Sequence, residues 1–220
     1  FKNKTTFNSD ISSWDVSSGT DFRGMFDGAN AFNQDIGSWD VSSGNNFGGM
    51  FFGADTFNQD IGGWNVSSGT NFSMMFYNAD SFNQDIGNWN VSSGTDFDSM
   101  FIGLRSFNQD ISSWDVSSGK NFSAMFYGAN SFNQDIGSWN VSRGNDFSWM
   151  FAEADALNQN IGNWQVSDSA LLTNMFFGTD LMLSNLGFSS NPTAAEFNKR
   201  RITDRNSLNT AITAWMADEA

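Results

Sequence analysis

Residues 32–54 read FNQDIGSWDVSSGNNFGGMFFGA, and most of the chain repeats this stretch with a period of 25 residues. The period is clearest in a column of seven tryptophans: Trp14, Trp39, Trp64, Trp89, Trp114, Trp139 and Trp164. A fixed period between about 20 and 50 residues is typical of proteins that stack one repeated supersecondary unit. The fold is therefore predicted from one row of 25 residues and the way its copies stack.

The large residues that recur in every row are apolar. Within residues 32–54 they are Phe32, Ile36, Trp39, Val41, Phe47, Met50 and Phe51. Constant apolar columns are what a continuous stacked core requires. We therefore expect the tryptophans to form part of the core instead of a recognition surface.

Two local patterns predict the secondary structure of each row. Trp-x-Val, at residues 39–41, places two apolar side chains on one side of an extended segment and indicates a short strand. The apolar residues of 22–29 follow the spacing i, i+3, i+4, i+7, which indicates one face of a helix of about ten residues. We predict an α/β repeat solenoid with one short parallel strand and one short helix in each 25-residue repeat.

The repeat pattern also predicts the domain organisation. Residues 1–181 are expected to form a solenoid of about seven repeats, and residues 182–220 a degenerate half-repeat followed by a helical C-terminal cap. The cap is predicted from helical patterns at 194–201 and 208–215. Phe1 falls in the column of Phe26, so we expect the sequence to begin inside a repeat.

Composition excludes several classes of function. The net charge is −14, with 24 acidic residues, 10 basic residues and no histidine, which disfavours nucleic acid and anionic lipid as partners. Cysteine is absent, which excludes a disulfide frame and thiolate metal sites. The sequence contains no apolar run of about 18 residues, so we expect no direct membrane insertion of this segment. Because the carboxylates are repeated and histidine is missing, nothing forms a unique catalytic constellation, and we expect no enzymatic activity.

The row FNQDIGSWDVSSGTDF, followed by MF and GA, resembles the short repeat of the BspA-like leucine-rich-repeat surface proteins. The resemblance covers about residues 1–181 and implies a leucine-rich-repeat-like fold, secretion or display on a cell surface, and a role in attachment, adhesion or matrix structure. It implies no catalytic residues. The sequence departs from the commoner pattern by having Ser-Gly where many relatives carry an apolar residue.

The polar residue between tryptophan and valine is a candidate binding column. On a strand these side chains would point outward and form a ladder across the exposed face. The ladder either satisfies itself through its own amides or forms a face that binds a partner. Its members are Asp15, Asp40, Asn65, Asn90, Asp115, Asn140 and Gln165.

A second column, which begins at Asp10 and ends at Asn160, consists almost entirely of aspartates. One interpretation is that each carboxylate accepts backbone amide hydrogen bonds in its own turn. The alternative is a row of Ca²⁺ sites, because this hard cation takes oxygen ligands. No cofactor is otherwise expected. The candidate calcium ligands are Asp35, Asp60, Asp85, Asp110 and Asp135.

Amide side chains form two further features. The column that begins Asn8, Asn33 and Asn58, with the glutamines that follow it, predicts a stacked amide ladder. Six glycosylation sequons occur, and those at Asn3, Asn71 and Asn121 are favoured because the other three fall in the predicted strand.

The sequence thus predicts a non-catalytic extracellular or cell-surface module that presents a repetitive polar face to a surface or matrix protein or a glycan. The alternative is a self-assembling subunit of an extracellular fibre or surface layer. Ice or mineral binding has the right periodicity but lacks a flat threonine-rich face.

Overall fold

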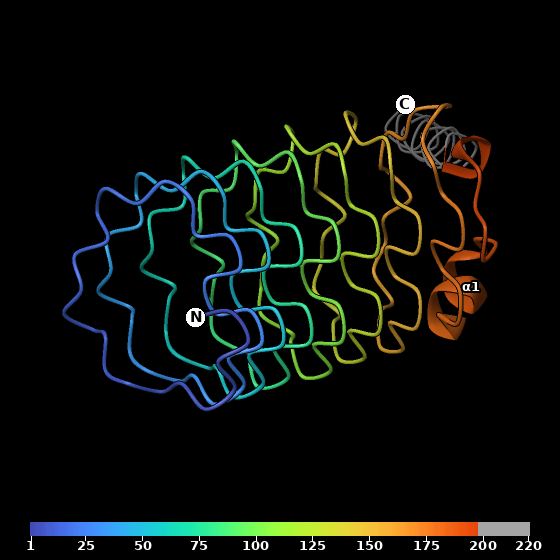
Figure 1. The fold of residues 1–220 in the computed structure, drawn as a ribbon. Helices are drawn as coiled ribbons and strands as arrows, with labels where there is room; N and C mark the ends of the chain where they lie inside the picture. The colour runs from blue at the N-terminus through green and yellow to red at the C-terminus, as the bar shows by residue number, and fades with distance from the viewer. Residues whose placement is uncertain (198–220) are drawn as a thin grey trace, which may run out of the picture.

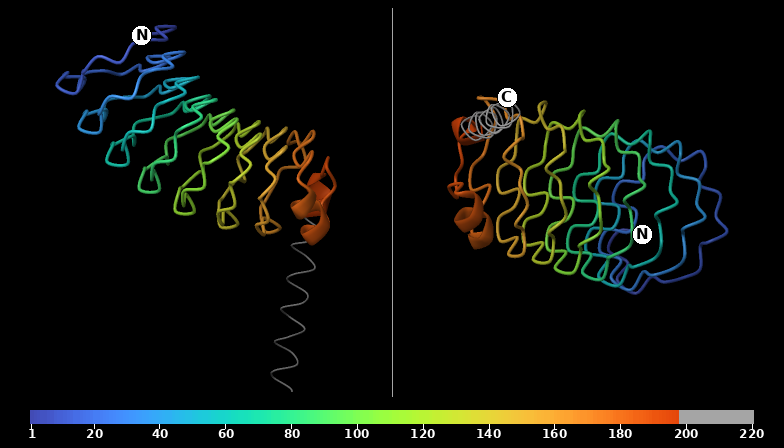
Figure 2. Two further views of the ribbon diagram at one scale, coloured as in Figure 1. Left: turned by 90° about the horizontal axis from the view of Figure 1, so that it is seen from below. Right: turned by 180° about the vertical axis from the view of Figure 1, so that it is seen from behind.

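The computed structural model describes residues 1–197 of the chain. The backbone winds through successive coils that stack along one axis and lead to the helix α1 (Asp180–Leu186) at the C-terminal end (Figure 1). Views from below and from behind show the same single row of coils (Figure 2). The 25-residue period of the sequence is therefore the length of one coil, and equivalent residues lie next to one another in neighbouring coils.

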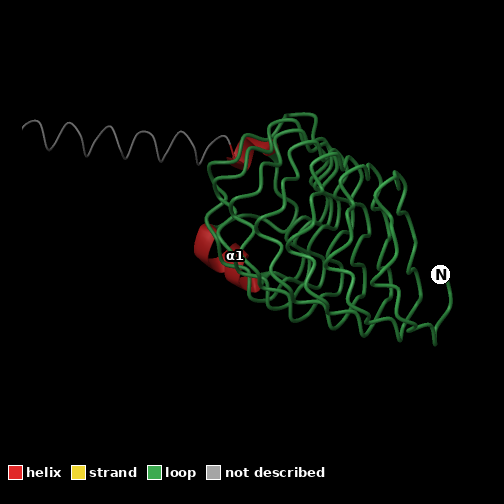
Figure 3. Ribbon diagram, turned by 90° about the vertical axis from the view of Figure 1, so that its left-hand side faces the viewer, coloured by secondary structure: helices red, strands yellow, loops and turns green. Residues whose placement is uncertain are grey.

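The predicted strand and helix in each repeat are wrong. Within residues 1–197, helical structure is confined to α1 and to residues 194–197, and almost all the rest is turn, bend or loop (Figure 3). Strand-like pairing in the same range is limited to single parallel bridges that begin with the pair Asp21 and Asn46 and end with Asp146 and Leu171. A leucine-rich-repeat-like α/β solenoid is thus not the fold, because the coils contain neither its strands nor its helices.

Left-handed residues prevent the helix that was predicted at residues 22–29. The backbone φ is 61° at Gly24 and 67° at Gly28, and a residue in this region ends a helix instead of continuing it. The chain makes consecutive tight turns, closed by Met25 N–H to Phe22 O at 3.2 Å and by Ala29 N–H to Phe26 O at 3.0 Å. We call residues 22–29 and their equivalents the turn segment. The same two places have positive φ at Gly49 and Gly53, Met74 and Asn78, Ser99 and Gly103, Ala124 and Gly128, Trp149 and Glu153, and Asn174 and Gly178.

Alternate amides of the turn segment join neighbouring coils. Phe22 N–H donates to Asn46 O at 2.8 Å, and Gly24 N–H donates to Gly48 O at 2.9 Å. The amides of residues 26 and 28 continue the series to Met50 O and Phe52 O. Each turn segment therefore satisfies its backbone partly within its coil and partly through the next coil, without forming a sheet.

The core is a set of stacked aromatic columns. Phe51 lies between Phe26 and Phe76 with ring centroids 5.6 Å apart on both sides, and the rings of Trp64 and Trp89 are nearly parallel at 6.4 Å. The prediction that the tryptophans belong to the core is confirmed for the column from Trp39 to Trp164, whose members are 2–4% exposed. Trp14, in the first complete row, is 47% exposed.

Each buried tryptophan also has a polar partner in the preceding coil. The indole N–H donates to the carbonyl oxygen of the isoleucine 28 residues earlier, at 3.0–3.2 Å. A buried indole normally requires such an acceptor. The tryptophan column therefore supplies both apolar packing and a chain of hydrogen bonds along the stack.

The C-terminal residues cover the last coil. Helix α1 ends at Gly187, which has a φ of 65° and donates its N–H to Leu183 O at 3.0 Å. Phe188 packs against Phe176 at 5.1 Å and against Phe197 at 4.6 Å, which extends the aromatic core beyond the last tryptophan. Of the predicted cap helices, residues 194–197 are helical, whereas 198–201 and 208–215 lie outside the described residues.

Candidate functional site

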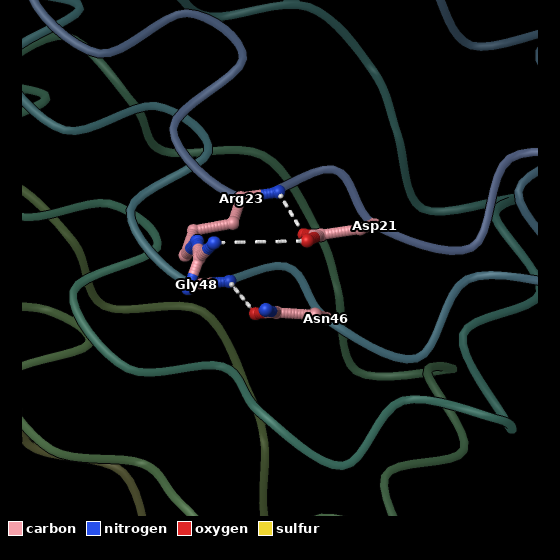
Figure 4. Close-up of polar contacts among 4 residues, drawn as sticks. All are labelled: Asp21, Arg23, Asn46 and Gly48. Atoms are coloured by element: carbon pink, nitrogen blue, oxygen red, sulfur yellow. Dashed lines mark hydrogen bonds and ion pairs between the residues drawn. The ribbon is translucent and has the colours of Figure 1, made fainter.

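Three polar columns of the coil use their side chains to close turns. Asp35 Oδ1 accepts a hydrogen bond from Gly37 N–H at 2.9 Å, and Asp40 Oδ1 accepts one from Ser42 N–H at 3.0 Å. The residues that form the parallel bridges between coils, from Asp21 to Leu171, are called the bridge column. In this column, Asn46 Oδ1 accepts a hydrogen bond from Gly48 N–H at 3.1 Å (Figure 4). These are Asx turns, in which a side-chain oxygen takes the place of a backbone acceptor.

The predicted binding column lies on the surface in equivalent positions of successive coils. All seven residues from Asp15 to Gln165 are exposed. In several of them the side-chain oxygen also accepts the hydroxyl of the following serine, as Asp15 does from Ser17 at 2.6 Å and Asn65 from Ser67 at 2.7 Å. These hydrogen bonds lie within one coil, so the column is a row of surface turns and not a ladder on a sheet.

Hydrogen bonds lower the pKa of several surface aspartates. The serine two residues further along, chiefly through its side chain, lowers the pKa of Asp15, Asp40, Asp110 and Asp115. For Asp10 the backbone amide of the serine is the main cause of the lowered pKa. These five carboxylates are therefore ionised at neutral pH and add negative charge to the outer surface.

The candidate calcium column is built in the same way. Its five aspartates are exposed, and each places Oδ1 2.9 Å from the amide two residues further along. Among residues 1–197, no three side chains of the histidine, cysteine, aspartate or glutamate type are grouped so that they would hold a metal ion. The observed role of these oxygens is to fix the corner of the coil, and the geometry adds no support for calcium.

The amide ladder predicted from the asparagine column is confirmed. Asn58 Oδ1 accepts Asn83 N–H at 3.0 Å and Gln84 Nε2–H at 3.0 Å, both from the next coil. The same pair of bonds begins at Asn8 and continues along the stack to Gln159. This column holds neighbouring coils together.

The favoured sequons lie in different surroundings from those expected. Asn71 and Asn121 belong to the bridge column and are half-buried, whereas Asn65, Asn90 and Asn140 are exposed. The reason for preferring the first two is therefore wrong, because the inter-coil bridges run through them. Asn3 is exposed, and its N–H donates to Asp27 O at 2.6 Å.

A surface that the sequence reasoning missed lies on the outside of the turn segments. It consists of the positions of Arg23, Gly24 and Asp27 and their equivalents in later coils, which we call the turn face. The residue type changes from coil to coil here, whereas the core columns are nearly constant. The signal was a set of aromatic side chains at these variable places: Phe52, Tyr77, Tyr127, Trp149 and Phe177.

These five residues, which we call the aromatic row, form two groups of contacts along the turn face, separated by the coil that carries Ile102 at this place. Phe52 and Tyr77 stack with centroids 4.5 Å apart, and Trp149 lies 6.2 Å from Tyr127 and 5.8 Å from Phe177. Trp149 is 37% exposed and Phe177 is 48% exposed. Exposed apolar side chains gathered in this way mark an interaction surface more often than isolated ones do.

One end of the turn face is hollowed. A depression of about 730 Å³ is lined by Arg23, Phe52 and Met74 and by three glycines, Gly24, Gly48 and Gly49. The absence of side chains at the glycines opens this space. Its charges are balanced, because Lys2 pairs with Asp27 at 2.6 Å and Arg23 approaches Asp21 at 3.9 Å (Figure 4).

Two titratable groups of the turn face have a raised pKa. Burial raises the pKa of Asp98, and the nearby charges of Asp96 and Asp146 act in the same direction. Burial and then the charge of Glu153 raise the pKa of Tyr127, which keeps its hydroxyl proton as a hydrogen-bond donor. These two groups therefore differ from surface aspartates such as Asp15 and Asp40, whose pKa is lowered.

The described residues also bear on membrane insertion. Within 1–197, no helix has the length and the apolar character needed to cross a bilayer.

Comparison with known proteins gives one family. The family model described as "Mycoplasma protein of unknown function, DUF285" matches residues 1–105 and again residues 70–188. Two overlapping matches are what a chain of repeats produces. Neither the curated proteins nor the solved structures contain a match to this chain.

Proposed function

We propose that this chain, which belongs to the DUF285 family, is a non-catalytic extracellular or cell-surface module that binds a protein or a glycan. The observation that carries the proposal is the arrangement of the surface. The stacked coils hold equivalent side chains in long rows on an aromatic core, and repeat proteins use such extended surfaces for binding.

The repeat frame adds a second line of support. Its resemblance to the BspA-like leucine-rich-repeat surface proteins suggests attachment or adhesion at a cell surface. The shared frame, with its FNQDI, Trp-Asp-Val and Met-Phe elements, consists of core and turn residues. The resemblance therefore supports a role in attachment, and the ligand must be found from the surface columns.

A direct test uses the purified 220-residue chain on two panels, one of matrix and cell-surface proteins and one of glycans. Saturable binding to a member of either panel is expected. Binding should persist at moderate salt if apolar contacts carry it, and weaken with salt if the rows of aspartates carry it. Absence of binding on both panels would overturn the proposal.

Self-assembly into a fibre or surface layer is the second candidate. It is favoured by the exposed apolar side chains of the turn face, where Trp149 is 37% exposed and Phe177 is 48% exposed. Sedimentation velocity over a wide range of protein concentration distinguishes the two candidates, because an assembling subunit grows with concentration and a monomeric binder does not.

A further inference from the structure

The aromatic row points to a more specific ligand. We propose that the aromatic row of the turn face binds a linear, uncharged polysaccharide, an inference that rests on the proposed function as a binding module. The outward polar column predicted from the sequence is not part of this site.

The row has the shape needed for a linear polymer. Phe52 and Tyr77 come from two neighbouring coils, and Tyr127, Trp149 and Phe177 come from three further neighbouring coils after the one that carries Ile102. Neighbouring coils repeat at about 5.6 Å, the spacing of Phe47 and Phe72 in the core. Trp149 bridges Tyr127 and Phe177, so three aromatic side chains form one continuous surface over neighbouring coils. An extended ligand that follows the stack can contact these side chains one after another, whereas a compact ligand can contact few of them.

The chemistry of the row matches that of a sugar ring. A pyranose has apolar C–H faces and a rim of hydroxyl groups, so it requires apolar surface beside hydrogen-bonding groups. Trp149 and Phe177 supply exposed apolar surface. Ser148 precedes Trp149 in the chain, and Asn174 occupies the place of Trp149 in the next coil. The Tyr127 hydroxyl donates its hydrogen to Glu153, so the two side chains add acceptor oxygens for sugar hydroxyl groups at the edge of the same surface.

An added peptide strand does not fit this face. Strand addition requires a row of free backbone N–H and C=O groups. Along the turn face these groups already join the coils, as in Trp149 N–H to Thr173 O at 2.9 Å and Glu153 N–H to Phe177 O at 2.7 Å. A ligand must therefore be recognised by side chains, which suits a polysaccharide.

Charge disfavours an acidic polymer. Single-stranded nucleic acids also stack on rows of aromatic side chains, but their binding sites are positively charged grooves. This chain has a net charge of −14, so it repels nucleic acids and acidic polysaccharides at moderate salt.

The repeats themselves supply substitutions that the fold accepts. Gly24 and Gly49 occupy the place of Trp149, and that place has a positive φ, so Trp149→Gly suits the backbone. Ala152 occupies the place of Tyr127, which makes Tyr127→Ala the matched change. A control away from the turn face is Asn163→Ser, because serine occupies this exposed place in most rows.

Affinity electrophoresis in native gels measures the binding directly. The acidic chain migrates well, and an uncharged polymer cast in the gel slows only proteins that bind it. The probes are mixed-linkage β-glucan, glucomannan, galactan and pullulan, with alginate as the acidic comparison. We expect the wild type and Asn163→Ser to be slowed by at least one uncharged polymer and not by alginate. Trp149→Gly and Tyr127→Ala should each weaken the affinity by roughly tenfold or more, as central aromatic contacts do.

The outcomes separate this inference from the proposed function. Thermal unfolding of each variant first shows that it is folded. If an uncharged polymer slows both folded variants as much as the wild type, the aromatic row is not the site, and the proposed function as a binding module stands. Binding to a protein on the panel without slowing by any polysaccharide would overturn the ligand class alone. A concentration-dependent dimer that Trp149→Gly abolishes would identify a second copy as the occupant and also overturn it. No binding in any assay would overturn both proposals.

Discussion

Trp89 donates its indole N–H to the carbonyl oxygen of Ile61, 28 residues earlier in the chain, at 3.0 Å. The two residues belong to neighbouring coils, and the Trp89 ring stacks between Trp64 and Trp114. The hydrogen bond therefore fixes the offset of one coil on the next, while ring stacking alone would tolerate sliding.

Trp89→Phe should lower the free energy of unfolding by about 2–3 kcal/mol, because it leaves a buried carbonyl without its donor and removes ring volume. The matched control is Trp14→Phe, since Trp14 belongs to the same column but is 47% exposed. That change should cost less than about 0.5 kcal/mol. Urea unfolding followed by circular dichroism measures both, and equal losses would show that the hydrogen bond contributes little.

Gly69→Ala tests how tightly the chain packs between Val66 and the turn segment that begins at Phe72. A Cβ at Gly69 would lie 2.5 Å from Phe72 Cζ and 2.9 Å from the carbonyl oxygen of Val66, which is closer than packing allows. The expected loss of stability is about 1–3 kcal/mol, as for other overpacked sites. Gly63→Ala is the control, because a Cβ there meets no atom within 4 Å, and it should be nearly neutral.

Ala124→Gly should stabilise the protein. Ala124 has a φ of 51°, a conformation that costs alanine about 1–2 kcal/mol and glycine almost nothing. Glycine loses more conformational entropy on folding than alanine, which offsets part of this benefit, so the free energy of unfolding should rise by about 0.5–1 kcal/mol. Ala31→Gly, at a residue outside the positive-φ region, should be destabilising instead. The midpoints of thermal unfolding should therefore move in opposite directions, and parallel shifts would contradict the explanation of the turn segment.

The core was predictable from the sequence, whereas the secondary structure was not. A strict period fixes which side chains are neighbours, so the columns of Phe51 and Trp64 follow from counting alone. The spacing of residues 22–29 is shared by a helix and by consecutive turns, and positive φ decides between them. Glycine marks that conformation at Gly24 and Gly28, but Met74, Ala124 and Trp149 adopt it without any signal in their residue type.

The predicted strand failed for a different physical reason. Alternation in Trp-x-Val is real, because Trp39 and Val41 are both buried and Asp40 is exposed. However, Asp40 Oδ1 accepts a hydrogen bond from the amide N–H of Ser42. Aspartate and asparagine side chains often compete in this way with the backbone hydrogen bonds of a sheet. The aromatic row was missed because a search for constant columns passes over the places where the repeats differ.

Asp98→Asn should stabilise the protein at neutral pH. Burial raises the pKa of Asp98 above its ordinary value of 3.8, so the folded state binds this proton more tightly than the unfolded state. The ionised carboxylate therefore destabilises the fold at all pH values above its folded-state pKa, and this cost disappears as the pH falls through that pKa towards 3.8. The unfolding midpoint of Asp98→Asn should exceed that of the wild type at pH 7, and the two should converge in acid.

Asp40→Asn provides a comparison of opposite sign. The hydrogen bonds of Ser42 lower the pKa of Asp40, so its charge stabilises the folded state above the ordinary value of 3.8, and this contribution is lost as the pH falls through the lowered pKa. Asparagine fills this place at Asn65 and Asn90, so the turn itself remains. Asp40→Asn should therefore be the less stable protein at pH 7 and approach the wild type in acid. If both variants were stabilised equally at pH 7, the loss of one of many negative charges would explain the effect, and the local environments of Asp98 and Asp40 would not.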